Sequence, residues 1–430
     1  MTFDIPSPCG CGMRHPAFKT EVLVGAGASV EIPGYALKLG MKHPYILCDK
    51  NTSVFADGIA SSLGRAGMSP DIFMFQTDHP LPDEKTVGSA FMHFDQAYDG
   101  IISVGSGVLN DTGKIVSRIT GRPYIIAATA PSMDGYASST SSMERDGLKI
   151  SLNTKIADVI VGDTDILKKA PDILLSAGMG DILAKYVAIC EWRISHIING
   201  EYYCEETASL VRKAIDRCVT NIPGLLKRDE KAVEAVFTGL IMSGSAMFFS
   251  GSSRPASGSE HYFSHIWDMR SLAFGTPSSL HGIQCAIGTV ETAKLYDKLK
   301  KIVPDPNKAI DHAASFDLRE WHGKLRNFIG PGAEIMISLE KSEKKYDTGL
   351  HRKRLENIIR NWDEILRIVE EEIPDVDDLK RFCAGSGCPT EPEDIGLPRS
   401  IVPMTFECTK DVRDKYILSR LFWDLGETAY

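Results

Sequence analysis

The chain has 430 residues, 43% of them hydrophobic and 24% charged, a composition typical of globular proteins with more than one domain. Its net charge is −9 and it has no basic stripe, which argues against nucleic acid as a partner and against stable membrane insertion. The first residues lack the apolar core of a secretion signal, and the ten cysteines are scattered. These features predict a cytoplasmic protein with reduced thiols.

Apolar runs of strand length alternate with helical segments between about residues 20 and 165. This alternation predicts a mostly parallel sheet covered by helices on both faces. Residues 1–165 are therefore expected to form a nucleotide-binding α/β domain. The predicted strands are 45–50, 71–76, 100–107, 124–130 and 158–163, and the helices between them include 53–66 and 110–120.

The residues that end the first of these strands bear on the cofactor. Asp49 is placed to accept a hydrogen bond from an adenosine ribose hydroxyl. A helix-capping role is the alternative, which Asn51 or Thr52 would fill equally well. Asp49 repels a 2′-phosphate whereas Lys50 attracts one. The sequence therefore predicts NAD, with tolerance of NADP.

A glycine-rich turn follows the third predicted strand, in GIISVGSGVLNDTGK. Gly105, Ser106 and Gly107 precede a helix that is expected to start near Asn110. Such a turn lets backbone amides and the helix dipole bind a pyrophosphate. Asn110 stands where the dinucleotide fingerprint has its third glycine, so an ordinary tight turn remains the alternative.

A hydroxyl-rich loop, ATAPSMDGYASSTSS (128–142), follows the fourth predicted strand. Open α/β sheets bind ligands at the carboxyl ends of their strands. The loop is therefore expected to contact a ligand, although a solvated serine-rich loop would look the same. Its polar candidates are Thr129, Ser132, Asp134 and Ser138.

The spacing of apolar residues becomes helical after residue 165. Residues 166–430 are therefore predicted to form an all-α domain. Glycine-, serine- and proline-rich loops interrupt it at 250–259 and 275–279. The predicted helices are 166–169, 180–199, 205–219, 231–249, 282–301 and 355–372.

Three side chains of this helical half form a candidate metal site. Asp181 is expected early in one helix, His261 lies in a second, and His281 starts a third. Two imidazoles and a carboxylate suit Zn²⁺, Fe²⁺ or Ni²⁺. Spacing alone favours His265 over His281 as the partner of His261, because residues four apart share a helix face. Asp181 also suits a purely structural place near a helix N-terminus.

A second set of metal-binding residue types lies near the N-terminus. Cys9 and Cys11 are followed by His15. The usual zinc-binding set has a second pair of ligands, which this segment lacks. A segment without metal is therefore the simpler interpretation.

Five blocks resemble, in order, a known enzyme family. They are SVGSGVLNDTGK, ATAPSMDGYASSTSSM, SAGMGDILAKY, SSRPASGSEHYFSH and LHGIQCAIG. The family includes glycerol dehydrogenase, iron-dependent alcohol dehydrogenases, dehydroquinate synthase and sn-glycerol-1-phosphate dehydrogenase, and the bacterial form of the last is the most similar. The resemblance implies an N-terminal Rossmann-like domain, an all-α C-terminal domain and an active site in the cleft between them. It also implies a homodimer.

The implied activity is the reversible reduction of dihydroxyacetone phosphate to sn-glycerol 1-phosphate, with NAD or NADP and one divalent metal ion (Zn, Ni or Fe). Asp181, His261 and His281 match the family's metal ligands. Gly105, Ser106, Gly107 and Asp111 match residues that border the cofactor phosphates, and Thr129 and Ser132 match cofactor contacts. Asp134 and Ser138 match positions beside the nicotinamide and the substrate, and His265 is expected near the substrate.

A phosphorylated substrate needs a cationic or amide-rich pocket. Arg254, close before His261, is the candidate for the phosphate contact, with a surface arginine as the alternative. Other activities stay open: a glycerol or other polyol dehydrogenase needs no phosphate pocket, and a dehydroquinate synthase-like cyclase accumulates no NADH. A non-catalytic binding module would not need the metal trio.

Overall fold

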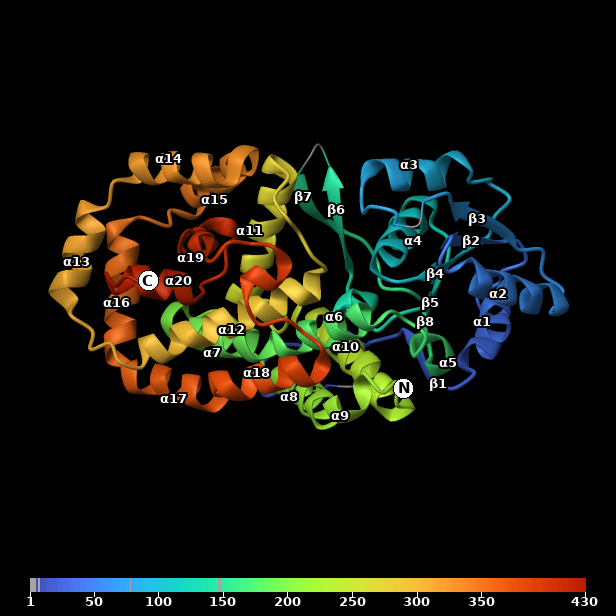
Figure 1. Cartoon of the computed structure of the whole chain (residues 1–430), viewed down its shortest axis with the longest axis horizontal. Coiled ribbons are helices and arrows are strands. Elements are labelled where there is room, and N and C mark those ends of the chain that lie inside the picture. Colours follow the sequence, from blue (N-terminus) through green and yellow to red (C-terminus); the bar gives the residue numbers. More distant parts are fainter. Residues whose placement is uncertain (1–4, 7, 78, 146–147) are drawn as a thin grey trace. The chain divides into compact units, whose positions relative to one another are not determined.

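The computed structural model describes residues 5–6, 8–77, 79–145 and 148–430 (Figure 1). It divides into two compact units. Unit 1 contains Met1–Ile182 and Lys213–Gly251, and unit 2 contains Leu183–Arg212 and Ser252–Tyr430. These ranges differ from the predicted division at residue 165. Helix α10 (Glu230–Ser250) belongs to unit 1 because Phe237 packs against Tyr136 with ring centroids 5.4 Å apart.

Unit 1 is built on a six-stranded parallel sheet with the order β1-β8-β5-β4-β2-β3. All five predicted strands are present, which confirms the expected α/β fold of this part. The prediction missed β1, a short strand with only one fully buried residue, Val22. The strands are β1 (Glu21–Gly25), β2 (Pro44–Asp49), β3 (Asp71–Phe75), β4 (Gly100–Gly105), β5 (Tyr124–Ala128) and β8 (Val159–Asp163).

An antiparallel hairpin of β6 (Thr140–Arg145) and β7 (Leu148–Asn153) follows the hydroxyl-rich loop. The prediction missed these strands because β6 begins with Thr140, Ser141 and Ser142, whereas the predicted strands are apolar runs. Thr140 pairs with Asn153 and Ser142 with Ser151 across the hairpin.

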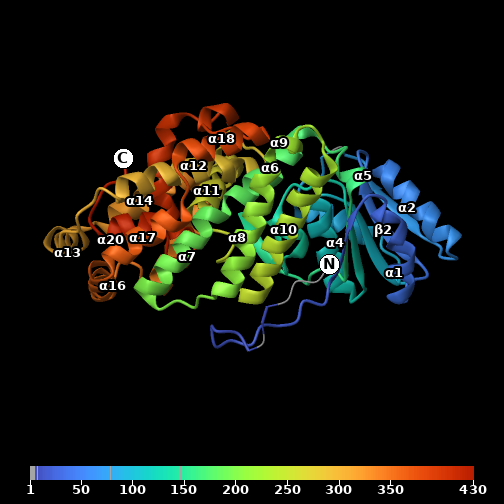
Figure 2. The ribbon, with the colours of Figure 1, turned by 90° about the horizontal axis from the view of Figure 1, so that it is seen from below.

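Helices cover both faces of the parallel sheet, as Figure 2 shows for α1, α2 and α4. Alternate strand residues such as Ile46 and Cys48 pack with Ala56 and Ile59 of α2 in one core cluster. On the other face, the Tyr45 hydroxyl donates to the carbonyl of Ala90 in α3. The remaining helices of this unit are η1 (Ala28–Glu31), α1 (Ile32–Lys38), α2 (Ser53–Arg65), α3 (Glu84–Met92), α4 (Gly107–Thr120), η2 (Asp134–Ala137), α5 (Thr164–Leu167), α6 (Asp172–Leu183) and α9 (Ile222–Leu225).

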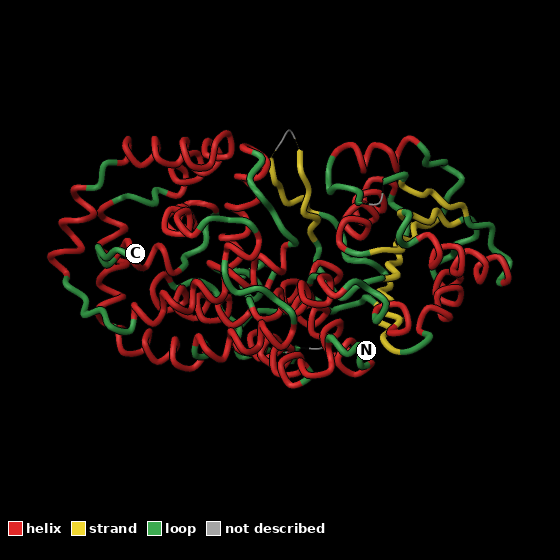
Figure 3. The backbone as a smooth tube through the Cα atoms, in the orientation of Figure 1, coloured by secondary structure: helices red, strands yellow, loops and turns green. Residues whose placement is uncertain are grey.

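Unit 2 consists of helices and loops throughout its described residues (Figure 3), as the helical spacing predicted. Helix α8 (Glu205–Thr220) spans the boundary of the two ranges. The other helices are α7 (Lys185–Asn199), α11 (Ser259–Phe274), α12 (His281–Leu299), α13 (Pro306–Ser315), α14 (Leu318–Ile329), η3 (Gly330–Gly332), α15 (Ala333–Glu343), α16 (Thr348–Arg360), α17 (Trp362–Glu372), α18 (Val376–Ser386), η4 (Pro392–Ile395), η5 (Arg399–Ile401), α19 (Val402–Val412) and α20 (Leu418–Asp424).

Two helical stretches, Asp172–Asn199 and Glu230–Ser250, are long and apolar enough to cross a membrane. In each, 83% of the apolar window is buried in the protein. Burial of this kind is typical of core helices. These stretches therefore give little support to a membrane-spanning role.

Candidate functional site

The order of the strands creates a topological switch point between β2 and β4. After β2 the chain forms β3 on one side of it, then returns to form β4 on the other side. Such a topological switch point is where open α/β sheets bind nucleotides, at the carboxyl ends of the strands. Asp49 ends β2 and Gly105 ends the neighbouring strand β4. Both predicted cofactor positions therefore lie at the switch point.

The glycine-rich turn leads into α4 earlier than predicted. The helix begins at Gly107, not near Asn110, and Ser106 is its N-cap without a side-chain cap hydrogen bond. A Cβ at Gly105 would overlap the Leu109 side chain, so only glycine fits there. The first amides of a helix have no partner within it. The turn therefore presents donors and the positive end of the helix dipole to an anion.

Buried polar side chains of α4 hold the hydroxyl-rich loop. The Lys114 Nζ donates to the carbonyls of Gly135, Ser138 and Thr140 at 3.0, 3.3 and 2.6 Å. Asn110, in the place of the third fingerprint glycine, donates to the Gly135 carbonyl at 3.2 Å. The departure from the fingerprint thus anchors the loop that follows β5.

The predicted cofactor contacts have partners inside unit 1. Asp49 Oδ1 accepts from the amide and hydroxyl of Thr52, both at 2.9 Å, and Thr52 is the N-cap residue of α2. Asp111 accepts from the Ser142 amide at 3.0 Å and pairs with Lys114 at 2.9 Å. Asp111 therefore supports the start of the hairpin.

The remaining loop residues lie where the loop leaves the sheet and returns to α4. The Thr129 amide donates to the Gly105 carbonyl at 3.1 Å, which joins the loop to the glycine-rich turn. Ser132 is buried. The Ser138 hydroxyl lies 3.0 Å from that of Thr140.

Asp181 is hydrogen-bonded to the backbone of this loop at Asp134. Asp181 is fully buried near the end of α6, not early in a helix as predicted. Its Oδ2 accepts from the backbone amide of Asp134 at 2.8 Å, and the Asp134 carboxylate accepts from the Ser243 hydroxyl at 2.9 Å. A Cβ at Gly178 would overlap the Pro131 carbonyl, so a glycine lets α6 approach the loop this closely.

His261 and His281 lie together in unit 2. His261 is the third residue of α11 and His281 the first of α12, and their ring centroids are 4.9 Å apart. One ligand atom of each lies within 4.8 Å of the others and of Cys285 Sγ. The His265 ring is 6.2 Å from that of His281. Asp181 belongs to unit 1, so its place beside the two histidines stays a prediction.

Hydrogen bonds orient both imidazoles. His261 Nδ1 lies 2.7 Å from the Glu260 carboxylate, so this nitrogen carries the proton and donates. His281 Nδ1 lies 2.9 Å from Ser264 Oγ, whose own proton goes to Gln284 at 2.6 Å. His281 Nδ1 is therefore also the donor. In this tautomer the Nε2 atoms are unprotonated, as metal-binding histidines require, and Cys285 Sγ lies 3.6 Å from Nε2 of His281.

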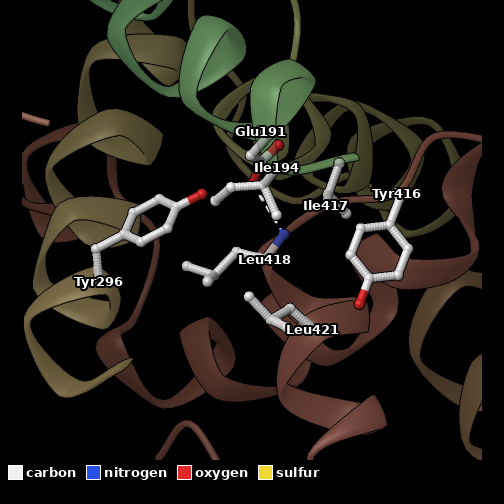
Figure 4. Close-up of a pocket in the computed structure, with 7 residues that line it drawn as sticks. All are labelled: Glu191, Ile194, Tyr296, Tyr416, Ile417, Leu418 and Leu421. Atoms are coloured by element: carbon white, nitrogen blue, oxygen red, sulfur yellow. Dashed lines mark hydrogen bonds between the residues drawn. The ribbon is translucent and has the colours of Figure 1, made fainter. Parts of the chain in front are cut away.

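A second buried acid fixes the start of α11. Glu191 accepts from the backbone amides of Ser259 and Leu418, at 2.8 and 2.9 Å. Burial and the nearby Glu260 carboxylate raise the pKa of Glu191 to about 8. Glu191 also lines a small cavity with Tyr296 and Leu418 (Figure 4). That cavity does not admit a water-sized molecule, so Glu191 has a structural place here.

Arg254 is buried, which the prediction of a phosphate contact did not anticipate. Its guanidinium forms a two-pronged ion pair with the Glu201 carboxylate and donates to the Tyr416 carbonyl at 2.9 Å. A third contact goes to the Ser195 hydroxyl at 3.2 Å. These contacts favour a structural role, and the phosphate contact stays a prediction.

Sequence reasoning missed four residues that support the site. The role of Lys114 could not be recognised from the sequence, because a lysine in a helix usually faces solvent. Glu260 and Ser264 act through their contacts with the histidines, and such contacts depend on how α11 and α12 pack. Cys285 had a local signal, since it lies four residues after His281 on the same helix face.

Comparison with known proteins places these features in a family. A sequence profile of iron-containing alcohol dehydrogenases matches residues 23–171. The fold is similar to that of a 1,3-propanediol oxidoreductase crystal structure, with a TM-score of 0.66 and 15% identity over 97% of this chain and 100% of that one.

Among sequence relatives, a glycerol-1-phosphate dehydrogenase [NAD(P)+] from Halalkalibacterium halodurans is 28% identical over 96% of this chain and 95% of its own. Another, from Methanothrix thermoacetophila, is 34% identical over 69% of this chain and 82% of its own. The chain therefore belongs to the glycerol-1-phosphate dehydrogenase family.

Proposed function

We propose that the protein catalyses the reversible reduction of dihydroxyacetone phosphate to sn-glycerol 1-phosphate with NADH or NADPH. Family membership supports the reaction. The observation that carries the chemistry is the pair His261 and His281, whose ring centroids lie 4.9 Å apart and whose Nδ1 atoms donate to Glu260 and Ser264. The proposal includes a cytoplasmic homodimer, whose subunit number light scattering will test.

We assign Asp181, His261 and His281 as the ligands of one Zn²⁺, Ni²⁺ or Fe²⁺ ion. When bound, such an ion would polarise the substrate carbonyl and lower the pKa of the product alcohol. Glu260 and Ser264 hold the two rings in place, as carboxylate and hydroxyl partners do for metal-binding histidines. The donor set of two imidazoles and a carboxylate fits all three metals.

The proposed cofactor site follows from the switch point. The amides of Gly105, Ser106 and Gly107 at the start of α4 bind the pyrophosphate, and Asp49 accepts from the ribose. Thr129, Ser132 and Ser138 line the nicotinamide side. We revise Asp111 from a phosphate neighbour to a residue that holds the hairpin, because its carboxylate binds the Ser142 amide and Lys114.

The substrate is proposed to bind next to Asp134 and His265. The Ser243 hydroxyl fixes the Asp134 carboxylate, so Asp134 is held ready to accept from a substrate hydroxyl. His265 lies one turn beyond His261 on α11 and is proposed to contact the substrate or to pass a proton to the product oxygen.

The proposal is tested by following NADH oxidation with dihydroxyacetone phosphate. Chelated protein is expected to be inactive and to recover when Zn²⁺, Ni²⁺ or Fe²⁺ is added back. Each metal is added separately, and NADPH replaces NADH in a parallel series. Turnover of glycerol but not of glycerol 1-phosphate would indicate a polyol dehydrogenase. Product formation without net change in NADH would indicate a cyclase, and inactivity with every metal contradicts the proposal.

Replacing Arg254 by alanine is expected to lower the free energy of unfolding by about 2–3 kcal/mol, because it removes the hydrogen bonds of a buried guanidinium and its ion pair with the half-buried Glu201. The KM for dihydroxyacetone phosphate should change little. Thermal unfolding and steady-state kinetics measure the two effects. The opposite pattern, a raised KM with unchanged stability, would establish the phosphate contact and contradict the structural role.

A further inference from the structure

We propose that Cys9, Cys11 and His15 bind a structural zinc ion that ties the N-terminal segment to helix α10. The site is separate from the residues assigned to catalysis and does not depend on the proposed function. One ligand atom from each of the three side chains lies within 4.8 Å of the others. Two thiols and an imidazole are the donor types that zinc prefers in structural sites.

The spacing of the ligand atoms fits one zinc ion. The Cys11 Sγ lies 3.3 Å from His15 Nε2. Sulfur and nitrogen ligands of a tetrahedral zinc ion lie about 3.5 Å apart, given bond lengths of about 2.3 and 2.0 Å. The structure therefore places these two atoms almost as the ion would hold them. Zinc would take the place of the thiol protons, which are released to solvent on binding.

The backbone prepares the two cysteines for this role. The Gly12 amide donates to the Cys9 carbonyl at 3.1 Å, and Gly12 has a φ of 78°, which glycine adopts without strain. The resulting turn brings Cys9 and Cys11 to the same side. The Met13 amide lies 3.4 Å from Cys11 Sγ and donates to it, and such a donor stabilises a thiolate over a thiol.

A partner on the far side of the imidazole fixes the ligand atom of His15. His15 Nδ1 lies 2.9 Å from the Phe249 carbonyl. A carbonyl only accepts, so Nδ1 carries the proton and Nε2 keeps its lone pair for the metal. Phe249 is the penultimate residue of α10, where carbonyls have no partner within the helix. The same arrangement orients the two histidines of the proposed catalytic site.

The segment is also packed onto the end of α10. The Phe18 ring lies 5.7 Å from that of Phe248 and 6.1 Å from that of Phe249. Cys9 is buried, and Cys11 and His15 are half-buried. A zinc ion would thus join a segment of irregular backbone to a long core helix, and we infer that its contribution is to stability.

Cobalt(II) is the probe for the test, because thiolate ligands give it a near-ultraviolet charge-transfer band that oxygen and nitrogen ligands do not. Chelated protein is reloaded with Co²⁺. The wild type is expected to show the band, and the double variant Cys9→Ser/Cys11→Ser to lose it together with about one metal ion per chain. The double variant should keep its kcat and unfold at a lower temperature.

Cys48→Ala is the matched control. Cys48 lies in the core of unit 1 and belongs to neither group of possible metal ligands among the described residues. Burial raises the pKa of its thiol to about 12, so it stays protonated. The control should keep the band. The His261→Ala variant should also keep it, which separates this site from the catalytic one. Because Cys285 lies beside the catalytic histidines, the double variant is also made in the His261→Ala background. A band that persists in that background, or is absent from the wild type, overturns the proposal.

A second measurement tests the site even if the double variant Cys9→Ser/Cys11→Ser does not fold. X-ray absorption at the zinc edge is recorded on the His261→Ala protein. A sulfur shell at about 2.3 Å is expected. A spectrum that needs only nitrogen and oxygen neighbours would contradict the site without any change to its cysteines.

Discussion

Replacing His261 by alanine is expected to lower kcat/KM for dihydroxyacetone phosphate by about 10³-fold or more, and to remove the metal ion of the proposed catalytic site. In a metal-assisted carbonyl reduction the cation lowers the activation free energy by several kcal/mol. Each 1.4 kcal/mol changes the rate about tenfold, so loss of the ion gives a loss of this size. Metal analysis and steady-state kinetics on the same preparation measure both effects. Far-ultraviolet circular dichroism should match the wild type.

His265→Ala is the matched control, since His265 lies one turn along the same helix. It should retain the metal ion and lose activity through substrate contact or proton transfer alone. Glu260→Gln is expected to have a metal content between those of the two histidine variants. It should weaken metal binding by about 10–100-fold, because Glu260 orients His261. If His265→Ala loses the metal and His261→Ala keeps it, the ligand assignment is wrong.

The sequence predicted the sheet of unit 1 well because its strands are strongly apolar. Strand β2, for example, is almost wholly buried, so its apolar run was easy to read. The hairpin of β6 and β7 was missed because its pairing depends on backbone contacts between polar residues. The compact units have other bounds than the predicted division at residue 165, since α10 packs with unit 1 through contacts made far along the chain, such as Phe237 on Tyr136.

Site residues that belong to a local sequence motif could be predicted. Site residues whose contacts depend on how distant segments pack could not. Gly105 and Asp49 follow from their places at strand ends. The pairing of His261 with His281 came from family resemblance, because spacing alone favoured His265. Arg254 forms its ion pair with Glu201, which is 53 positions away in the chain. The spacing of apolar residues along the sequence gives no information on such a contact. Asp181 was placed at the wrong end of its helix because α6 and α7 read as one apolar run.

Lys114→Met is expected to lower the free energy of unfolding by about 3 kcal/mol and to raise the KM for NADH. The lysine is fully buried, and its Nζ binds three loop carbonyls and the Asp111 carboxylate. Methionine fills a similar volume but donates nothing, so the carboxylate and the carbonyls lose their partner in a region with little water. Denaturant unfolding measures the first effect and steady-state kinetics the second.

The kinetic effect should include the cofactor, because the loop that Lys114 holds is joined to the glycine-rich turn through the Thr129 amide and carries Ser138. Arg118→Ala is the matched control on the same helix. Its guanidinium bonds the Asn153 carbonyl at an exposed position, so its removal should change stability by less than about 0.5 kcal/mol. Equal losses of unfolding free energy in the two variants would show that Lys114 contributes no more to stability than an exposed cation does. A stability loss with unchanged KM for NADH would show that the loop does not shape the cofactor site.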